Sequence, residues 1–314
     1  MERWVEETLH RGFRVRLKAD RVLFDSETEH QRLIIFDNAD FGRVMMLDNV
    51  VQLTTKDEFV YHEMMAHVPL FAHGRANKAL IVGGGDGGVL REALKHPELE
   101  QVTLCEIDQG VIDLCRQHFP NISAGAYDDP RTRIVIADGT KFVAETDDRF
   151  DVIMVDSTDP IGPGAVLFTK QFYADCARSL KPGGLLVTQN GLPFLQAPEL
   201  QQSVGFFREL FGDASAYLAS TPSYFGGPMS YGWRPTTRSS GAIAASGSNG
   251  AIRRPAPSRR AIGGPTSMSP PLRCPPISAT WSRGNATIAP FSAGRPPAAG
   301  NSRGTRRSRH SSLR

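Results

Sequence analysis

The first 55 residues alternate apolar and polar positions in short runs, which is the pattern of strands with one buried face. Asp37-Asn38 and Asp48-Asn49 lie between consecutive runs and supply the side chains that favour tight turns. The pattern therefore predicts a small antiparallel sheet with strands over residues 13–17, 32–36, 43–47 and 50–53.

From residue 57 onward the spacing of apolar residues changes. Residues 57–71 carry Phe59, Met64, Val68 and Phe71 at helical intervals, which predicts a connecting helix. Short apolar runs then alternate with helical segments, an order typical of right-handed β-α-β crossovers and a parallel sheet. The predicted strands are 79–82, 102–107, 133–137, 151–155 and 185–189, and the predicted helices are 88–95, 109–119, 169–180 and 198–211. Residues 215–219 and 229–233 are expected to complete the sheet edge as a hairpin.

The periodic pattern stops after Trp233, where the composition also changes. Residues 234–314 contain 14 Arg and no Lys, Asp or Glu. The overall charge of +3 is therefore the sum of a basic tail and an acidic first part, because residues 1–233 have 22 Lys and Arg against 33 Asp and Glu, a net charge of −11. A segment so rich in Arg, Ser, Gly, Ala and Pro cannot bury enough apolar surface to offset its ordering entropy. We expect a disordered tail, whose composition a coding region read out of frame would explain. The alternative is an Arg-rich arm that binds nucleic acid or an anionic membrane.

Cysteine usage and hydropathy limit the class of protein. Four cysteines show no C-x-x-C pairing or metal-ligand spacing, so we expect reduced, structural thiols and no metal. No run of about 18 apolar residues is present, and the charged N-terminus lacks the apolar centre of a signal peptide. A cytoplasmic protein without a membrane partner is expected.

A glycine-rich loop carries the most specific chemical signal. Gly83, Gly85 and Gly88 match the G-x-G-x-x-G fingerprint between a predicted strand and a predicted helix. In that fingerprint the loop amides and the helix N-terminus bind a pyrophosphate. Asp86 would place a negative charge against this anion, which disfavours an NAD-dependent oxidoreductase. The loop indicates instead a nucleoside ligand with a cationic end.

Carboxylates follow the next two predicted strands. Glu106 ends the second strand about twenty residues beyond the loop, where such folds place an acid that accepts the ribose hydroxyl hydrogens. Asp138, after the third strand, can accept a hydrogen from an adenine amine, and Gly139 lets the base approach the backbone. The alternatives are a surface acid for Glu106 and ordinary turn chemistry for Asp138 and Gly139.

The fourth strand ends in Asp156-Ser157-Thr158-Asp159, which is followed by Pro160 and Pro163. Ligands in open α/β sheets bind beyond the carboxyl ends of the strands, so Asp86, Asp156 and Asp159 should face one crevice. Three acids there suit a polyamine better than an anion. The alternative is that Asp159 caps the next segment and that Asp156 alone is functional.

These residues resemble the spermidine synthases, a family of polyamine aminopropyltransferases, over residues 4–233. The motifs that carry the resemblance are Thr8-Leu9-His10, His30-Gln31, Asp57-Glu58-Phe59, Tyr61-His62-Glu63-Met64-Met65, the Gly83 to Gly88 loop, Glu106-Ile107-Asp108, residues 127–131, residues 156–163, Gln189-Asn190-Gly191 and residues 222–227. Family members normally continue with an Asn-Pro-x-x-His-x-x-Ala-Phe-x-Leu-Pro segment near the end, which residues 234–314 do not contain.

The resemblance implies an α/β fold in which a small N-terminal antiparallel β-domain (1–56) precedes a methyltransferase-like Rossmann domain (57–233) with a mostly parallel seven-stranded sheet; residues 234–314 are the tail. It also implies that decarboxylated S-adenosylmethionine, a co-substrate rather than a bound cofactor, donates an aminopropyl group to putrescine. The products are spermidine and methylthioadenosine. A homodimer or homotetramer is expected, and nucleic acid is not expected as a partner.

The same resemblance assigns roles to individual residues. Asp156 is the implied proton acceptor, and Asp86 lies beside the aminopropyl amine. The residues implied to hold the methylthioadenosine part are Gln31, Gly83, Gly85, Glu106, Asp138, Gly139 and Pro163. Those implied to bind the diamine are Gln52, Tyr61, His62, Asp86, Asp156, Ser157, Thr158, Asp159, Gln189 and Tyr224. Considered alone, His62 is better explained as a satisfied helix histidine.

Asp86 separates aminopropyl transfer from methyl transfer. S-adenosylmethionine keeps an α-carboxylate, which Asp86 would repel, whereas the decarboxylated donor keeps only its amine. A small-molecule methyltransferase on the same sheet remains the alternative enzyme, although it would not need Asp86, Asp156 and Asp159 together. A further alternative is an impaired synthase relic with an Arg-rich nucleic-acid-binding tail.

Overall fold

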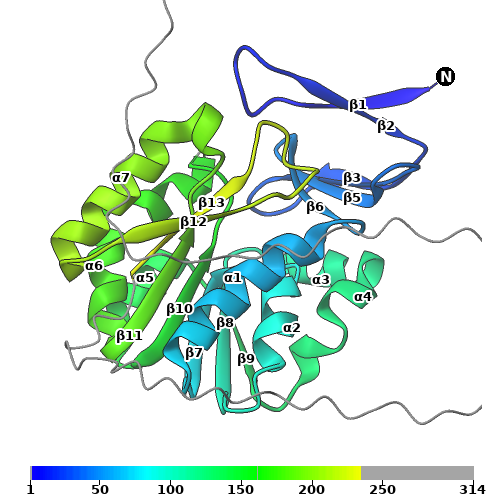
Figure 1. The fold of residues 1–314 in the computed structure, drawn as a ribbon. Coiled ribbons are helices and arrows are strands. Elements are labelled where there is room, and N and C mark those ends of the chain that lie inside the picture. Colours follow the sequence, from blue (N-terminus) through cyan, green and yellow to red (C-terminus); the bar gives the residue numbers. More distant parts are fainter. Residues whose placement is uncertain (1, 161, 235–314) are drawn as a thin grey trace, which may run out of the picture. The chain divides into compact units, whose positions relative to one another are not determined.

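The N-terminal region contains two antiparallel sheets rather than the single one predicted (Figure 1). The structure is a computed structural model that describes residues 2–160 and 162–234. Strand β1 (Arg3–Glu7) pairs with β2 (Val15–Ala19), and β3 (Arg21–Glu27), β4 (Arg32–Asn38), β5 (Gly42–Leu47) and β6 (Val50–Thr54) form a four-stranded meander. Strands β1 and β3 are mostly exposed and therefore lack the clear apolar alternation that predicted the others. Asp48 and Asn49, with φ of 46° and 61°, make the turn between β5 and β6 as expected.

The predicted parallel sheet and its edge hairpin are confirmed. Strands β7 (Lys78–Gly83), β8 (Gln101–Glu106), β9 (Thr132–Ile136), β10 (Phe150–Asp156) and β11 (Leu180–Gln189) are parallel, and β12 (Ser215–Ala219) and β13 (Met229–Trp233) form the hairpin. The order is β12-β13-β11-β10-β7-β8-β9, so β13 lies antiparallel to β11 and completes a seven-stranded sheet.

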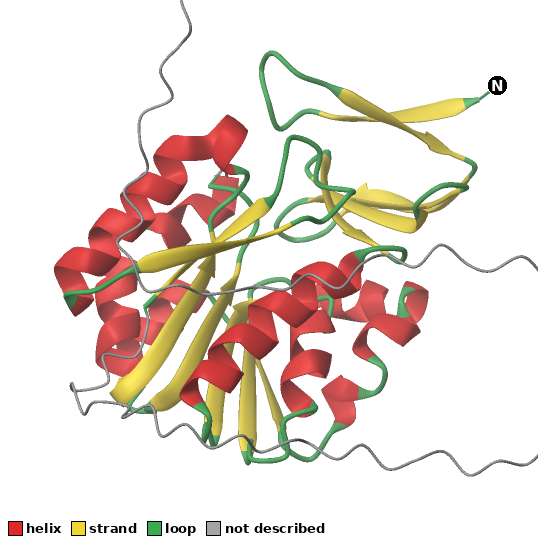
Figure 2. Ribbon diagram, viewed as in Figure 1, coloured by secondary structure: helices red, strands yellow, loops and turns green. Residues whose placement is uncertain are grey.

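Helices cover both faces of this sheet (Figure 2). They are α1 (Glu58–His73), α2 (Gly88–Leu94), α3 (Gln109–His118), α4 (Pro120–Ser123), α5 (Gly139–Glu145), α6 (Lys170–Ser179) and α7 (Pro193–Phe211), with 3₁₀ segments η1 (Ala126–Asp128) and η2 (Gly162–Phe168). Helix α5 was not predicted because only one of its seven residues, Val143, is buried, so the segment shows no apolar repeat. Helix α7 begins five residues earlier than the predicted 198–211 and contains a non-helical residue at Gln196.

The apolar strands are buried on both faces, which explains their nearly continuous hydrophobic runs. Leu80, Ile153 and Leu186 are neighbours across three strands and belong to the core shared with α5, α6 and α7. Ala79 and Ile81 point to the opposite core, which α1 and α2 cover. Successive side chains of a strand point to opposite faces of the sheet, so alternate residues pack against the helices of one face or of the other.

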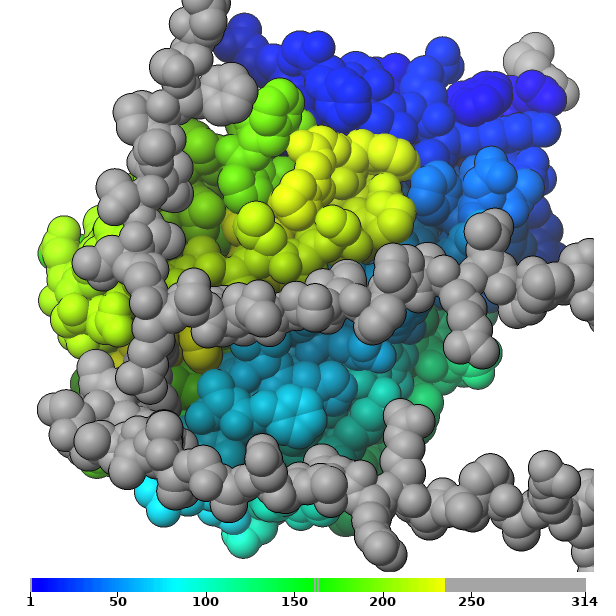
Figure 3. All heavy atoms as spheres, in the orientation of Figure 1, coloured from blue at the N-terminus to red at the C-terminus, as the bar shows by residue number. Residues whose placement is uncertain are grey.

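The N-terminal sheet packs over the carboxyl edge of the large sheet. Leu33, Ile35 and Met45 share a buried cluster with Val111 and Cys115 of α3. On the other side Phe225, in the loop before β13, packs against the N-terminal sheet, and Figure 3 shows that loop in contact with the first strands. The two parts therefore enclose the space beyond the strand ends.

Three cysteines in the part of the chain that the structure describes, Cys105, Cys115 and Cys176, are buried free thiols. None of the helices within residues 2–160 and 162–234 has the length and apolarity needed to cross a bilayer. All the described residues belong to one unit. The predicted tail, apart from Arg234, lies outside the described residues.

Candidate active site

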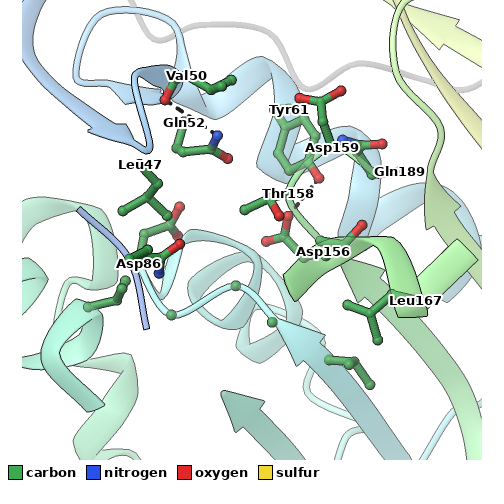
Figure 4. A pocket seen from close by; sticks show the side chains of 18 of the residues that line it. Leu47, Val50, Gln52, Tyr61, Asp86, Asp156, Thr158, Asp159, Leu167 and Gln189 are labelled. Atoms are coloured by element: carbon green, nitrogen blue, oxygen red, sulfur yellow. Dashed lines mark hydrogen bonds between the residues drawn. The ribbon is translucent and has the colours of Figure 1, made fainter. Parts of the chain in front are cut away.

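A cavity of about 380 Å³ lies at the carboxyl ends of β7, β8 and β10, between the large sheet and the N-terminal sheet (Figure 4). It is lined by every predicted site residue whose side chain the structure describes: Gln31, Gln52, Tyr61, His62, Gly83, Gly85, Asp86, Glu106, Asp138, Gly139, Asp156, Ser157, Thr158, Asp159, Gln189 and Tyr224. The side chain of Pro163 lies outside the described residues. The cavity thus brings together groups that are up to 193 positions apart, from Gln31 to Tyr224.

The glycine loop passes so close to other groups that a Cβ atom has no room at several of its positions. A Cβ atom at Gly83, where φ is +78°, would lie 2.1 Å from the Asp156 carbonyl oxygen, and one at Gly85 would lie 2.9 Å from the Glu106 carboxylate. A Cβ at Gly88 would lie 2.2 Å from the His62 ring. The third glycine of the fingerprint therefore makes room for an imidazole.

We expect Gly88→Ala to destabilise the protein by about 1–3 kcal/mol, since the added methyl group must displace the buried His62 ring. Urea unfolding would measure the change. The matched control is Gly205→Ala in α7, where no atom lies within 4 Å of the added methyl group. Helix propensity predicts that the control raises stability by about 0.5–1 kcal/mol. Equal stability of the Gly88→Ala variant and the parent would contradict the crowding argument.

Glu106 is held at the end of β8 by two backbone amides. Its Oε2 accepts a hydrogen bond from the Gly85 amide at 3.1 Å, and its Oε1 accepts one from the Asp108 amide at 3.0 Å. Burial raises the pKa of Glu106 to about 7, against the opposing effect of these amides. Each oxygen keeps lone-pair capacity for a hydroxyl donor, which suits the predicted contact with a ribose.

Asp138 and Gly139 also have structural roles. Asp138 caps α5 by accepting hydrogen bonds from the Thr140 amide at 2.8 Å and the Thr140 hydroxyl at 2.6 Å. A Cβ at Gly139 would lie 2.4 Å from Val82 Cγ1, so close packing on β7 already requires a glycine here. Both residues line the cavity in addition to these roles.

Gln31 is fixed by a residue to which sequence reasoning gave no role. Its Nε2 donates to Asp108 Oδ2 at 3.2 Å, and the Thr28 hydroxyl donates to the same oxygen at 2.6 Å. Asp108 also caps α3 through the Gly110 amide. An Asp directly before a predicted helix is a recognisable N-cap, but its second contact depends on the N-terminal sheet.

Asp156, the last residue of β10, accepts a hydrogen bond from the Tyr61 hydroxyl at 2.6 Å. Burial and the negative charge of Asp86 raise the pKa of Asp156 to about 7, while His62 and the Tyr61 hydroxyl oppose the rise. A carboxylate that exchanges its proton near neutral pH is well matched to general-base catalysis.

Tyr61→Phe tests this environment. The Tyr61 hydroxyl stabilises ionised Asp156, so its removal should raise the pKa of Asp156 further. As the pH is lowered, a rate that requires ionised Asp156 will then begin to fall at a higher pH than it does in the parent. The pH dependence of kcat/KM measures this movement, and an acidic limb that stays in place would contradict the expected role of Tyr61.

Asp86 and His62 form an ion pair beside Asp156. Asp86 Oδ1 accepts a hydrogen bond from the Gly88 amide at 2.6 Å, and Oδ2 lies 3.3 Å from His62 Nε2. Burial would raise the pKa of Asp86, but the charge and hydrogen bond of His62 lower it below its usual value. Burial likewise opposes the charge on His62, but Asp86 and Glu58 raise the pKa of His62 to about 10. His62 is thus a satisfied helix histidine that also lines the cavity.

Two further carboxylates, those of Asp159 and Glu7, line the cavity. Asp159 accepts a hydrogen bond from Gln196 Nε2 at 2.6 Å, and burial raises its pKa. Glu7, which sequence reasoning did not assign to the site, is buried and accepts from the Val51 amide at 3.1 Å. Burial raises the pKa of Glu7, and the charge of Asp159 contributes. Close carboxylates of this kind favour a cationic ligand.

Gln189 and Tyr224 are held by hydrogen bonds to backbone groups, whereas Ser157 is not. Gln189 Oε1 accepts from the Gly191 amide at 2.9 Å, and the Tyr224 hydroxyl donates to the Gln52 carbonyl oxygen at 2.8 Å. The Ser157 hydroxyl is buried without a hydrogen-bond partner among the described residues.

Glu7 and Gln196 show which site residues the sequence does not reveal. Glu7 lies on the same face of β1 as the buried Val5. A carboxylate two positions after an apolar residue in a strand was the one sequence feature that could have pointed to it. Gln196 lies at the irregular point of α7, where no periodic pattern applies. Within the described residues, no group of three or more His, Cys, Asp or Glu side chains is arranged to hold a metal ion.

Comparisons with known proteins agree with this architecture. Residues 58–240 match the model of the spermine/spermidine synthase domain, and residues 3–55 match that of the spermidine synthase tetramerisation domain, which supports an oligomeric assembly. A polyamine aminopropyltransferase of Ruegeria sp. (strain TM1040) is 55% identical over 232 residues, covering 74% of this chain and 82% of the relative. One of Yersinia pestis (strain Pestoides F) is 56% identical over 232 residues, covering 74% and 78%.

Solved structures give the same result. A crystal structure of spermidine synthase in complex with the transition state analogue AdoDATO has a TM-score of 0.71 and 40% identity, and the match covers 74% of this chain and 81% of that one. The spermidine synthase from Thermotoga maritima has a TM-score of 0.68 and 38% identity over 74% and 80% of the two chains. The chain therefore belongs to the spermine/spermidine synthase family and is an aminopropyltransferase.

Proposed function

We propose that this enzyme transfers the aminopropyl group of decarboxylated S-adenosylmethionine to putrescine, with Asp156 as the proton acceptor. The observation that carries the proposal is the pairing, in one cavity, of an anionic Asp86 with an Asp156 whose pKa is about 7. The first suits the amine of a cationic donor, and the second suits removal of a proton from an ammonium. The analogue bound by the solved spermidine synthase supports a donor of this class.

The reaction follows from these two environments. Putrescine enters as a dication, and its proximal ammonium gives a proton to Asp156, which frees the nitrogen lone pair. That lone pair attacks the aminopropyl carbon next to the sulfonium. The carbon–sulfur bond breaks, its electron pair stays on sulfur, and methylthioadenosine leaves. Holding the two reactants in line supplies much of the acceleration.

The site divides between donor and acceptor as follows. We assign the nucleoside to Gln31, Gly83, Gly85, Glu106, Asp138, Gly139 and Pro163, and the diamine to Gln52, Tyr61, His62, Ser157, Thr158, Asp159, Gln189 and Tyr224. Glu7 joins Asp159 at the distal ammonium, because both carboxylates line the cavity and the charge of Asp159 acts on Glu7. We also propose a cytoplasmic homodimer or homotetramer with the organisation 1–56, 57–233 and 234–314.

An assay of the purified full-length chain tests the proposal. Decarboxylated S-adenosylmethionine is combined in turn with putrescine, a longer diamine and spermidine, and methylthioadenosine release is measured. We expect the fastest release with putrescine. A methylated amine formed from S-adenosylmethionine, with no reaction of the decarboxylated donor, would establish a methyltransferase instead.

A further inference from the structure

A buried chain of alternating charges leads from α2 to the glycine loop. Arg91 Nη1 and Nη2 donate to Glu58 Oε1 and Oε2 at 3.1 and 2.9 Å. Glu58 Oε2 also contacts His62 Nδ1, and His62 Nε2 lies 3.3 Å from Asp86 Oδ2. The side chains are between 3% and 15% exposed, so water screens these pairs weakly.

The contacts of the two His62 ring nitrogens favour one protonation state. Both ring nitrogens face carboxylate oxygens. An ionised carboxylate accepts hydrogen bonds but cannot donate them. A neutral imidazole carries a single N–H, whereas an imidazolium donates from both nitrogens. Glu58 and His62 are four positions apart on α1 and therefore lie on the same helix face. When Glu58 and Asp86 are both ionised, an imidazolium therefore satisfies both contacts, whereas a neutral imidazole satisfies one.

Arg91 holds Glu58 in place. Its guanidinium is anchored by Nη1, which donates to the Ile122 carbonyl oxygen at 2.7 Å, and by Nε, which donates to Glu92 Oε1 at 2.7 Å. A bidentate Arg–carboxylate pair fixes orientation as well as charge. Glu58 therefore presents one oxygen to His62 in a defined position.

We propose that Glu58 and Arg91 are positioning residues of the transfer reaction: they hold His62 as an imidazolium, which keeps Asp86 an anion while Asp156 gains and loses the proton. Without the imidazolium, two neighbouring buried carboxylates would compete for one proton, because like charges in a buried site disfavour double ionisation. The reaction named here rests on the proposed function, whereas the state of His62 does not.

Further titratable and charged groups surround His62 and Asp86. The titratable or charged side chains coupled electrostatically to His62 or Asp86, besides each other, are Glu58, Arg91, Cys115, Tyr127, Asp156 and Tyr224. The Tyr61 ring packs edge-on against the His62 ring. Glu58 and Asp86 bond to the imidazole nitrogens. Glu58 is thus the partner of His62 that does not itself line the cavity.

The direct test measures the protonation of His62 by ¹⁵N-histidine NMR in the full chain without substrate. In the parent we expect His62, assigned by the signal lost in His62→Gln, to remain an imidazolium at pH 8. In Glu58→Gln the titration of His62 should move toward neutral pH, because the amide has no negative charge to stabilise the imidazolium. The matched control is Glu63→Gln, the same change at an exposed position of the same helix, which should leave the signal unmoved. An imidazolium that persists unchanged in Glu58→Gln would overturn the proposal.

A second readout uses activity. In Glu58→Gln we expect kcat/KM to fall about tenfold at pH 7 and to recover at higher pH, since loss of the His62 charge raises the pKa of the carboxylates. A purely structural role would lower activity equally at all pH values. Arg91→Lys keeps the charge but loses the bidentate pair, and should move His62 in the same direction by a smaller amount. If Glu58→Gln does not fold, an unmoved His62 titration in Arg91→Lys overturns the proposal.

The two proposals fail in different ways. A parent chain without aminopropyl transfer would reject the proposed function, while the NMR titration would still decide the role of Glu58. An active parent with an unchanged His62 signal in Glu58→Gln would reject the positioning role alone.

Discussion

Asp156→Asn is expected to lower kcat for aminopropyl transfer by about 10²- to 10⁴-fold, the usual contribution of a positioned general base. The amide keeps the size of the side chain and can still accept the hydrogen bond from Tyr61. It cannot take a proton from the acceptor ammonium, so the nucleophilic lone pair is not released. Single-turnover release of methylthioadenosine measures the loss, and calorimetric binding of methylthioadenosine should be nearly unchanged.

The control is Asp113→Asn, the same substitution at an exposed position of α3, which should retain full activity. The pH profile adds a second criterion. The pKa of Asp156 is raised to about 7, so kcat/KM of the parent should fall as the pH drops through 7 and the carboxylate becomes protonated. Asp156→Asn should lose that dependence. Parent-like turnover in the variant would remove Asp156 from the catalytic role.

Asp86→Asn should weaken the preference for the decarboxylated donor. We expect kcat/KM with decarboxylated S-adenosylmethionine to fall about 100-fold, because truncating one member of a buried charge pair costs about 2–5 kcal/mol. S-adenosylmethionine, whose α-carboxylate no longer meets a negative charge, should bind more tightly than it does to the parent.

The ratio of the inhibition constant of S-adenosylmethionine to the KM of the decarboxylated donor expresses this preference in one number. Asp113→Asn again serves as the control and should leave the ratio unchanged. A ratio in Asp86→Asn equal to that of the parent would show that another group makes the discrimination.

Much of the site could be predicted because strand ends are visible in the sequence. The apolar runs that end at Val82, Cys105 and Val155 place Gly83, Glu106 and Asp156 at one edge of a parallel sheet. Asp156 pairs directly with Gly83 in the register of β10 and β7. Local periodicity was therefore enough to bring the loop and two carboxylates together.

The second set of contacts could not be predicted in this way. Arg91 and Glu58 are 33 positions apart and meet because α1 and α2 pack on the same face of the sheet. Glu7 reaches the cavity because β1 and the N-terminal sheet lie over the strand ends. Helix α5 and the early start of α7 were missed because neither has a regular apolar repeat.

The sequence by itself determined the parallel sheet, the glycine loop and the acidic character of the site, because periodicity and strand-end chemistry are local properties of the chain. Tertiary structure alone decided how these acids differ. Asp86 lies against His62 and is stabilised as an anion, whereas Asp156 is buried beside that anion and its pKa rises to about 7. The physical reason is that the pKa of a carboxyl group depends on burial and on neighbouring charges, which folding brings from distant parts of the chain.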